Sequence, residues 1–129
     1  MQLKELFSTI DPKRFTSEFS TEKQCLEFLA NEKWDKEFVC KKCGHTNYCK
    51  GKTPFSRRCT RCKSDESATA HTPFHGCKIP ITVAFQMTYQ ICHQPDISSY
   101  KLAEKHDIRQ MTCWKLKKKI SECLTQNPD

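Results

Sequence analysis

Two pairs of cysteines, each with two residues between its members, constrain this chain more than any other feature. Cys40 and Cys43 form the first pair, Cys59 and Cys62 form the second, and fifteen residues separate the pairs. Such pairs turn sharply enough for both sulfurs to reach one metal, and the spacer is long enough for a hairpin that brings the pairs together. Gly44 is expected to take the positive φ that the first turn needs. Four thiolates complete the coordination of Zn²⁺, so the pattern predicts one structural zinc.

The composition favours metal over disulfides. Hydrophobic residues make up 36% of the 129 residues, a low share for a domain held together by its core alone. The N-terminus has no uninterrupted apolar stretch and no cleavage-like site, and the longest apolar-rich segment, residues 79–92, is too short and polar to span a bilayer. We therefore expect a cytoplasmic protein without membrane contact. The reducing conditions of the cytoplasm disfavour disulfides among the ten cysteines.

Other potential ligands lie near the four cysteines. Cys49 has no partner two or three residues away, so we interpret it as a strand residue. His71 and His75 flank Pro73-Phe74 and are interpreted as structural hydrogen-bonding residues. The cysteines on the inward faces of expected helices should behave as small buried hydrophobic residues; they are Cys25, Cys92, Cys113 and Cys123.

Positive charge is concentrated in the C-terminal two thirds of the chain. The net charge is +7, with −2 over residues 1–38 and +9 over residues 39–129. Residues 39–64 contain eight basic residues and no acidic one. A face of this density suits the phosphate backbone of double-stranded DNA, although a solvated surface that only confers solubility would show the same charge.

The sequence pattern predicts helix, then strands, then helices along the chain. Residues 20–33 have helical periodicity, and Thr21 with Gln24 forms a capping-box pattern. A turn or two of helix is expected ahead of it, ending at Pro12 and built on Leu3, Leu6, Phe7 and Ile10. Turn and strand residues dominate residues 39–70, for which we predict short antiparallel strands over residues 46–50, 55–58 and 67–70.

Three helices are predicted in the last third, over residues 81–93, 98–106 and 110–124. Pro80 suits the first position of the first helix, and Ser98 suits the cap of the second. The short connection between the last two helices is typical of a helix-turn-helix, with Asp107 in the turn because Asp tolerates left-handed backbone. A three-helix packing unit with a basic solvent face is the alternative.

In the helix-turn-helix interpretation the last helix enters the major groove of DNA. Arg109 would contact guanine and Gln110 adenine, while residues 117–119 suit phosphates. The residues that we predict to contact DNA are Lys50, Lys52, Arg57, Arg58, Arg61 and Lys63 in the cysteine-rich region, and Arg109, Gln110, Met111, Trp114, Lys115 and Lys118 at the helical end.

Several of these segments together resemble a known family. The runs FSTEKQCLEFLANEKWDKEFVCKKCGHTNYCK, RRCTRCK and TPFHGCKIP are similar to the N-terminal half of insertion-sequence 1595 family transposases, over residues 19–124. The resemblance implies a zinc ribbon, a helix-turn-helix and recognition of transposon ends, with homo-oligomers in a full transposase. His71, Pro73 and His106-Asp107 depart from the family pattern. The catalytic ribonuclease-H-like half of that family has no counterpart among these residues, so we expect no catalytic residues here.

These inferences predict a small α+β protein with a rubredoxin-like zinc ribbon. We expect an N-terminal helical segment packing on the ribbon (1–38), the ribbon (39–72), a linker (73–79), a helix-turn-helix (80–125) and a tail (126–129). A standalone regulator or protein-binding adaptor is the alternative to a transposase module. An enzyme is disfavoured, because Cys77 with His75 is the one candidate nucleophile–base pair and nothing nearby would orient it.

Overall fold

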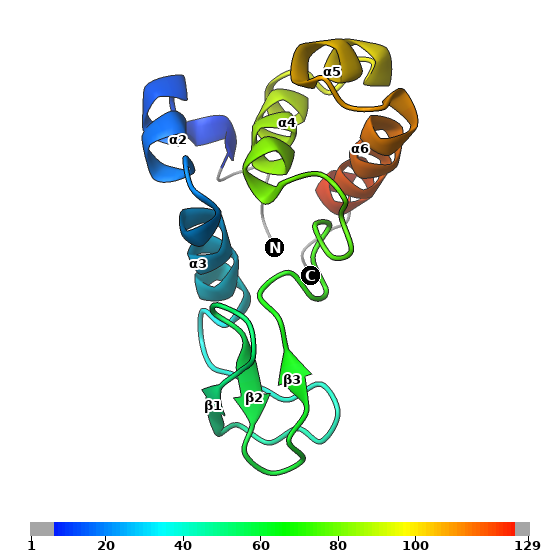
Figure 1. Ribbon diagram of the computed structural model, residues 1–129. Helices are drawn as coiled ribbons and strands as arrows, with labels where there is room; N and C mark the ends of the chain where they lie inside the picture. Colours follow the sequence, from blue (N-terminus) through cyan, green and yellow to red (C-terminus); the bar gives the residue numbers. More distant parts are fainter. Residues whose placement is uncertain (1–6, 126–129) are drawn as a thin grey trace.

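The computed structural model describes residues 7–125, with side chains as far as Cys123. Its helices and strands, shown in Figure 1, are α2 (Pro12–Glu18), α3 (Glu22–Lys33), β1 (Tyr48–Lys50), β2 (Arg57–Cys59), β3 (Asp65–Glu66), α4 (Ile81–His93), α5 (Ser99–His106) and α6 (Gln110–Thr125). The small α+β class predicted from the sequence is confirmed, with the cysteine cluster at the strands.

A helix begins at Pro12, where the sequence analysis predicted only that one would end. Asp11 caps α2, since its carboxylate accepts the Arg14 N–H at 2.8 Å, and Pro12 occupies the first turn, where no hydrogen bond is lost. Residues 7–9 are helical, as predicted, while Leu3 and Leu6 lie outside the described residues. Pro12 begins a helix because Asp11, directly before it, supplies the cap.

The capping box of α3 is confirmed. The Gln24 N–H donates to Thr21 Oγ1 at 3.2 Å, and Gln24 Oε1 accepts the Thr21 N–H at 3.0 Å. These reciprocal bonds satisfy two N–H groups that a helix start leaves without partners. The buried face of α3 consists of Cys25, Leu29 and Ala30.

The ribbon is a three-stranded antiparallel sheet in the order β1-β2-β3. Tyr48 pairs with Cys59, and Arg57 pairs with both Lys50 and Glu66. The prediction of a third strand over residues 67–70 is wrong, because β3 spans Asp65–Glu66 and a turn follows it. In that turn the carbonyls of Ser67 and Ala70 accept hydrogen bonds from Lys33 Nζ of α3, so these carbonyls bind an ammonium group instead of a neighbouring strand.

The last three helices agree with their predicted ranges to within one residue at either end. Pro80 is the cap of α4 and not its first residue, since its ψ of 138° is extended. Ser98 caps α5 by accepting the Lys101 N–H at 3.1 Å. Asp107, with φ 54° and ψ 49°, adopts the expected left-handed conformation. The helices enclose a core that includes Leu102, Cys113, Leu116 and Ile120.

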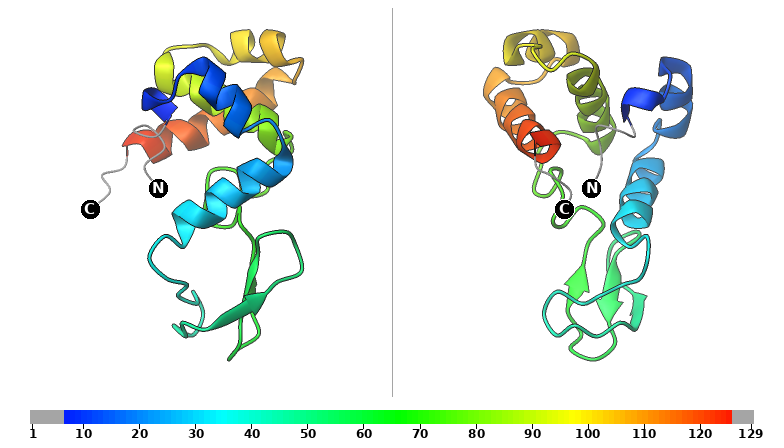
Figure 2. Two further views of the ribbon diagram at one scale, coloured as in Figure 1. Left: turned by 90° about the vertical axis from the view of Figure 1, so that its left-hand side faces the viewer. Right: turned by 180° about the vertical axis from the view of Figure 1, so that it is seen from behind.

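A cluster of phenylalanines joins the N-terminal helices to α4. Phe19 lies 5.0 Å from Phe28 and 5.3 Å from Phe85, and Phe7 lies 5.7 Å from Phe85, measured between ring centroids. Tyr89 of α4 also donates to the carbonyl of Ile10 at 2.7 Å. The N-terminal helices therefore pack on the helical end, while the C-terminal end of α3 reaches the ribbon (Figures 1 and 2).

Candidate metal centre and nucleic-acid interface

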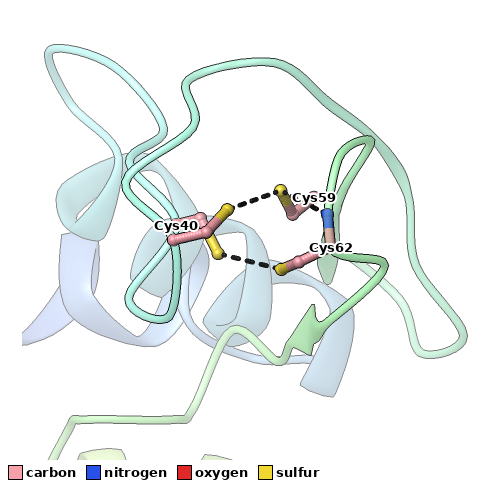
Figure 3. Close-up of side chains that lie close together, drawn as sticks. Cys40, Cys59 and Cys62 are labelled. Carbon is pink, nitrogen blue, oxygen red and sulfur yellow. Dashed lines mark hydrogen bonds between the residues drawn. The ribbon is translucent and has the colours of Figure 1, made fainter.

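The four cysteines of the two pairs lie together at one end of the ribbon. Their sulfurs are all within 4.8 Å of one another, and the Cys40–Cys62 and Cys43–Cys59 sulfur pairs are each 3.5 Å apart. Figure 3 shows the side chains of Cys40, Cys59 and Cys62 turned toward one another. Four sulfurs at about 2.3 Å from a tetrahedral zinc would stand about 3.8 Å apart, so the observed spacing fits one zinc ion.

Each cysteine pair is followed directly by a residue with left-handed backbone. The Gly44 N–H donates to the Cys40 carbonyl at 2.9 Å with φ +77°, as predicted. Lys63 occupies the equivalent position after the second pair, donating to the Cys59 carbonyl at 3.0 Å with φ 65°. The sequence did not indicate this conformation, because a lysine is rarely left-handed. The two turns are therefore alike in geometry although only one has glycine.

Backbone amides and one hydroxyl support the thiolates. The N–H groups of Arg61 and Cys62 point at Cys59 Sγ from 3.4 and 3.5 Å. Ser64 Oγ lies 3.5 Å from Cys40 Sγ and 3.2 Å from Cys62 Sγ. This hydroxyl, followed by the Cys43 amide, lowers the pKa of Cys40 to about 5, and it also lowers the pKa of Cys62. Ser64 was not among the predicted site residues, since serine carries no ligand signal.

Not all four cysteines favour the thiolate in the absence of a cation. The His45 amide favours ionisation of Cys43, but desolvation and hydrogen bonds with the neighbouring sulfurs outweigh it and raise the pKa of Cys43 to about 11. A divalent cation at the centre removes this conflict because it offsets the negative charges. The donor set thus fits one structural Zn²⁺, and four protein ligands leave no coordination position for a substrate.

The other cysteines and histidines of the region lie outside the cluster. Cys49 is exposed on β1, and neither His71, His75 nor Cys77 joins the four ligands. Within residues 7–125 no group of three or more carboxylates is close enough to hold a metal. Cys25 is fully buried, and desolvation raises the pKa of its thiol to about 12. Cys25 is therefore a core residue, as predicted.

Residues at the C-terminal end of α3 hold the ribbon in place. Lys33 Nζ lies 2.7 Å from Glu66 Oε2, and the two side chains are only 9% and 11% exposed. The Arg57 guanidinium lies 4.7 Å from the Trp34 ring centroid and 4.1 Å from that of Tyr48. Arg57 was predicted to contact DNA, but its charged group is stacked within the protein.

The remaining predicted DNA-contact residues fall into two groups. Two form internal bonds: Arg58 pairs with Asp65 at 3.2 Å, and Gln110 donates to Ser99 Oγ at 2.7 Å. The others have exposed side chains; they are Lys50, Lys52, Arg61 and Lys63 on the ribbon and Arg109, Met111, Trp114, Lys115 and Lys118 at the helical end. Met111 and Trp114 are large apolar side chains left 57% and 45% exposed.

Comparison with known proteins identifies the ribbon. Residues 20–65 match the family model of the transposase zinc-ribbon domain. The match begins beside the cap of α3, ends at β3 and contains all four cysteines of the cluster. No curated protein and no solved structure matches the chain. No helix within residues 7–125 is long and apolar enough to cross a bilayer.

Proposed function

We propose that this protein is a DNA-binding module of a transposase, or one derived from it, that recognises double-stranded DNA at transposon ends. The observation that carries the proposal is the match of residues 20–65 to the transposase zinc-ribbon domain, because this segment contains the complete Cys₄ cluster. The zinc ribbon is itself non-catalytic, since its four ligands leave no open position. The family match therefore supports a binding role for this segment.

The exposed cations of the ribbon suit the phosphate backbone. Arg61 and Lys63 lie in and beside the second cysteine pair, and Lys41 and Lys42 lie within the first; all four are exposed. Their backbone positions are determined by the turns that hold the sulfurs, so zinc binding would present them in one arrangement. Phosphate contacts of this kind contribute affinity without sequence preference.

Helices α4–α6 would act as a helix-turn-helix. α5 and α6 are joined through the left-handed Asp107, and α6 packs on both α4 and α5. Arg109 and Met111 at the start of α6 are exposed, as the first residues of a recognition helix must be. Gln110 bonds to Ser99 of α5, so we assign it to positioning α6 and assign base contacts to Arg109 and its exposed neighbours.

The module would bind DNA without cutting or joining it. Strand transfer by two metal ions needs a cluster of carboxylates, and residues 7–125 contain none. In a full transposase, a separate catalytic part would supply that chemistry, and homo-oligomers would bring two ends together.

A salt series of gel-shift measurements tests the proposal. The zinc-loaded protein is titrated onto a random duplex and onto a terminal-repeat duplex at several salt concentrations. We expect log Kobs to fall linearly with log[salt], and tighter binding to the repeat. R61Q/K63Q should weaken binding to both duplexes, while K13Q/K36Q, with the same charge change on exposed residues outside the ribbon, should not. Absence of salt-sensitive binding to either duplex would refute the proposal.

A protein-binding adaptor is the second candidate, and one feature favours it. A groove of about 710 Å³ lies between α3 and the β1–β2 hairpin, with apolar side chains that include Leu26, Tyr48 and Phe55. Unchanged DNA affinity in R61Q/K63Q would favour this candidate for the ribbon. L26E, which places a charge in the groove, should then abolish binding to the partner without releasing zinc.

A further inference from the structure

A second groove lies between the linker that follows the ribbon and the last helix. Residues of the linker, among them Gly76, Cys77 and Lys78, form one wall, and residues of α6 form the other. Its volume is about 500 Å³. In Figure 1 the green linker loop lies beside the orange and red α6, although the two segments are far apart in the sequence.

The linker wall of this groove is held in place at both ends. Phe74 and Ile79 are buried, 3% and 5% exposed, and the Phe74 ring lies 4.9 Å from Phe85. Between them the Cys77 N–H donates to the Phe74 carbonyl at 3.3 Å. Residues 75–78 therefore form a short loop anchored to the core, and Lys78 projects from a fixed position.

The groove is strongly cationic. Its lining contains four lysines, Lys78, Lys115, Lys118 and Lys119, against one acidic residue, Glu122. All four lysines are exposed. Lys119 Nζ reaches the opposite wall, where it donates to the His75 carbonyl at 3.4 Å. A polyanion is the ligand that such a lining attracts.

We propose that this groove holds one strand of the phosphodiester backbone of duplex DNA, with Lys78 from the linker and Lys119 from α6 as its phosphate contacts. Lys119 Nζ would exchange its 3.4 Å bond to the His75 carbonyl for a phosphate oxygen. The inference rests on the proposed DNA binding. Lys119 belongs to the segment that the sequence already assigned to phosphates, and Lys78 is a contact that the sequence did not indicate. A helix in the major groove lies between two phosphate strands, so lysines on its flank come near one of them. The half-exposed Trp114 lines the same groove, and Lys118 Nζ lies 5.3 Å from its ring centroid, so the ring holds one of the groove's cations.

The salt dependence of duplex binding tests the contact. Zinc-loaded wild-type protein and K78Q/K119Q are compared on one labelled 20-base-pair duplex by fluorescence anisotropy, with K13Q/K36Q as the charge-matched control. The slope of log Kobs against log[salt] should decrease by about 0.9 for each lost phosphate contact, hence by nearly 2 in K78Q/K119Q, and stay unchanged in the control. If K78Q/K119Q keeps the wild-type slope while the wild type binds, the groove assignment is wrong and the proposed function stands. If the wild type does not bind, both are wrong.

Cys77 provides a second measurement that needs no variant. Its half-buried thiol lines the groove, so duplex DNA should slow its alkylation by N-ethylmaleimide several-fold, as read by peptide mass spectrometry. An unchanged rate at saturating duplex would overturn the assignment. Protection by the corresponding single strand but not by the duplex would overturn the choice of duplex DNA.

Discussion

The left-handed Lys63 should lower the stability of the zinc ribbon, and K63G tests this directly. Left-handed backbone costs a non-glycine residue about 1–2 kcal/mol. Glycine avoids that cost. However, it gives the unfolded chain more conformational freedom, which lowers the free energy of unfolding by about 0.5–1 kcal/mol. The Lys63 side chain is exposed and forms no ion pair among those of the described residues. We therefore expect K63G to stabilise the zinc-loaded ribbon by about 0.5–1 kcal/mol.

The assay is competition for zinc against a chromophoric chelator, because metal binding free energy appears as folding free energy in such a site. A gain of about 0.7 kcal/mol corresponds to a roughly threefold lower Kd for zinc. K42G is the matched control, since Lys42 is an exposed lysine of the first pair without positive φ, and there glycine should weaken zinc binding. G44A is the converse substitution. A methyl group at Gly44 would meet no atom within 4 Å, so we expect G44A to destabilise the zinc-loaded ribbon by about 1 kcal/mol or more through the positive φ alone.

K63G and K42G together decide the argument. If K63G weakens zinc binding as much as K42G does, the left-handed conformation at Lys63 imposes no cost and the reasoning is refuted. DNA affinity should be measured separately, because Lys63 is also a proposed phosphate contact.

Three further outcomes follow from buried or neighbouring groups. K33M should destabilise the protein by about 3 kcal/mol in chemical denaturation, because it leaves Glu66 without its partner, and K33M/E66L should recover part of that loss. C49S should leave zinc stoichiometry at one, whereas C59S should abolish tight binding, as measured by mass spectrometry under native conditions. Burial, with a smaller contribution from Lys105, lowers the pKa of His106 below its usual 6.5, so the unfolded chain takes up a proton first as the pH falls. The free energy of unfolding should therefore fall as the pH drops from about 7 through 6.5, and it should level off below the folded-state pKa. H106Q should lack this loss of stability when denaturation curves at pH 8 and pH 5 are compared. An equal pH response in the wild type and H106Q would contradict the prediction.

The features that the sequence predicted correctly depend on signals within a few residues of one another. Thr21 and Gln24 form a capping box three residues apart, Ser98 caps the helix that starts beside it, and the spacing within each cysteine pair sets the sulfur geometry. Asp107 adopts left-handed backbone for reasons of its own side chain. Each of these preferences is present before the chain folds, so the sequence alone is enough to find it.

The features that the sequence did not predict depend on contacts between distant segments. β3 ends at Glu66, and the carbonyls of Ser67 and Ala70 beyond it accept hydrogen bonds from Lys33, more than thirty residues earlier in the chain. Arg57 looked like one more basic residue of a run, yet it stacks between Trp34 and Tyr48. The linker groove joins residues 73–78 to α6, and no local pattern connects them. A run of positive charge thus predicts a binding surface only after the structure shows which cations are already paired.

The partners of the ribbon's cations determine which part of the ribbon would contact DNA. Arg57 and Arg58 are partly exposed and already have partners within the ribbon, whereas the exposed cations of the ribbon are concentrated in and beside the two cysteine pairs and on the hairpin at Lys50 and Lys52. Cations within a cysteine pair take up a defined arrangement only when the four sulfurs are held together. Zinc binding and phosphate binding would then favour the same backbone conformation, and two ligands that favour one conformation raise each other's affinity by equal factors. Under the proposed function, the structural zinc therefore contributes to DNA affinity without contacting DNA.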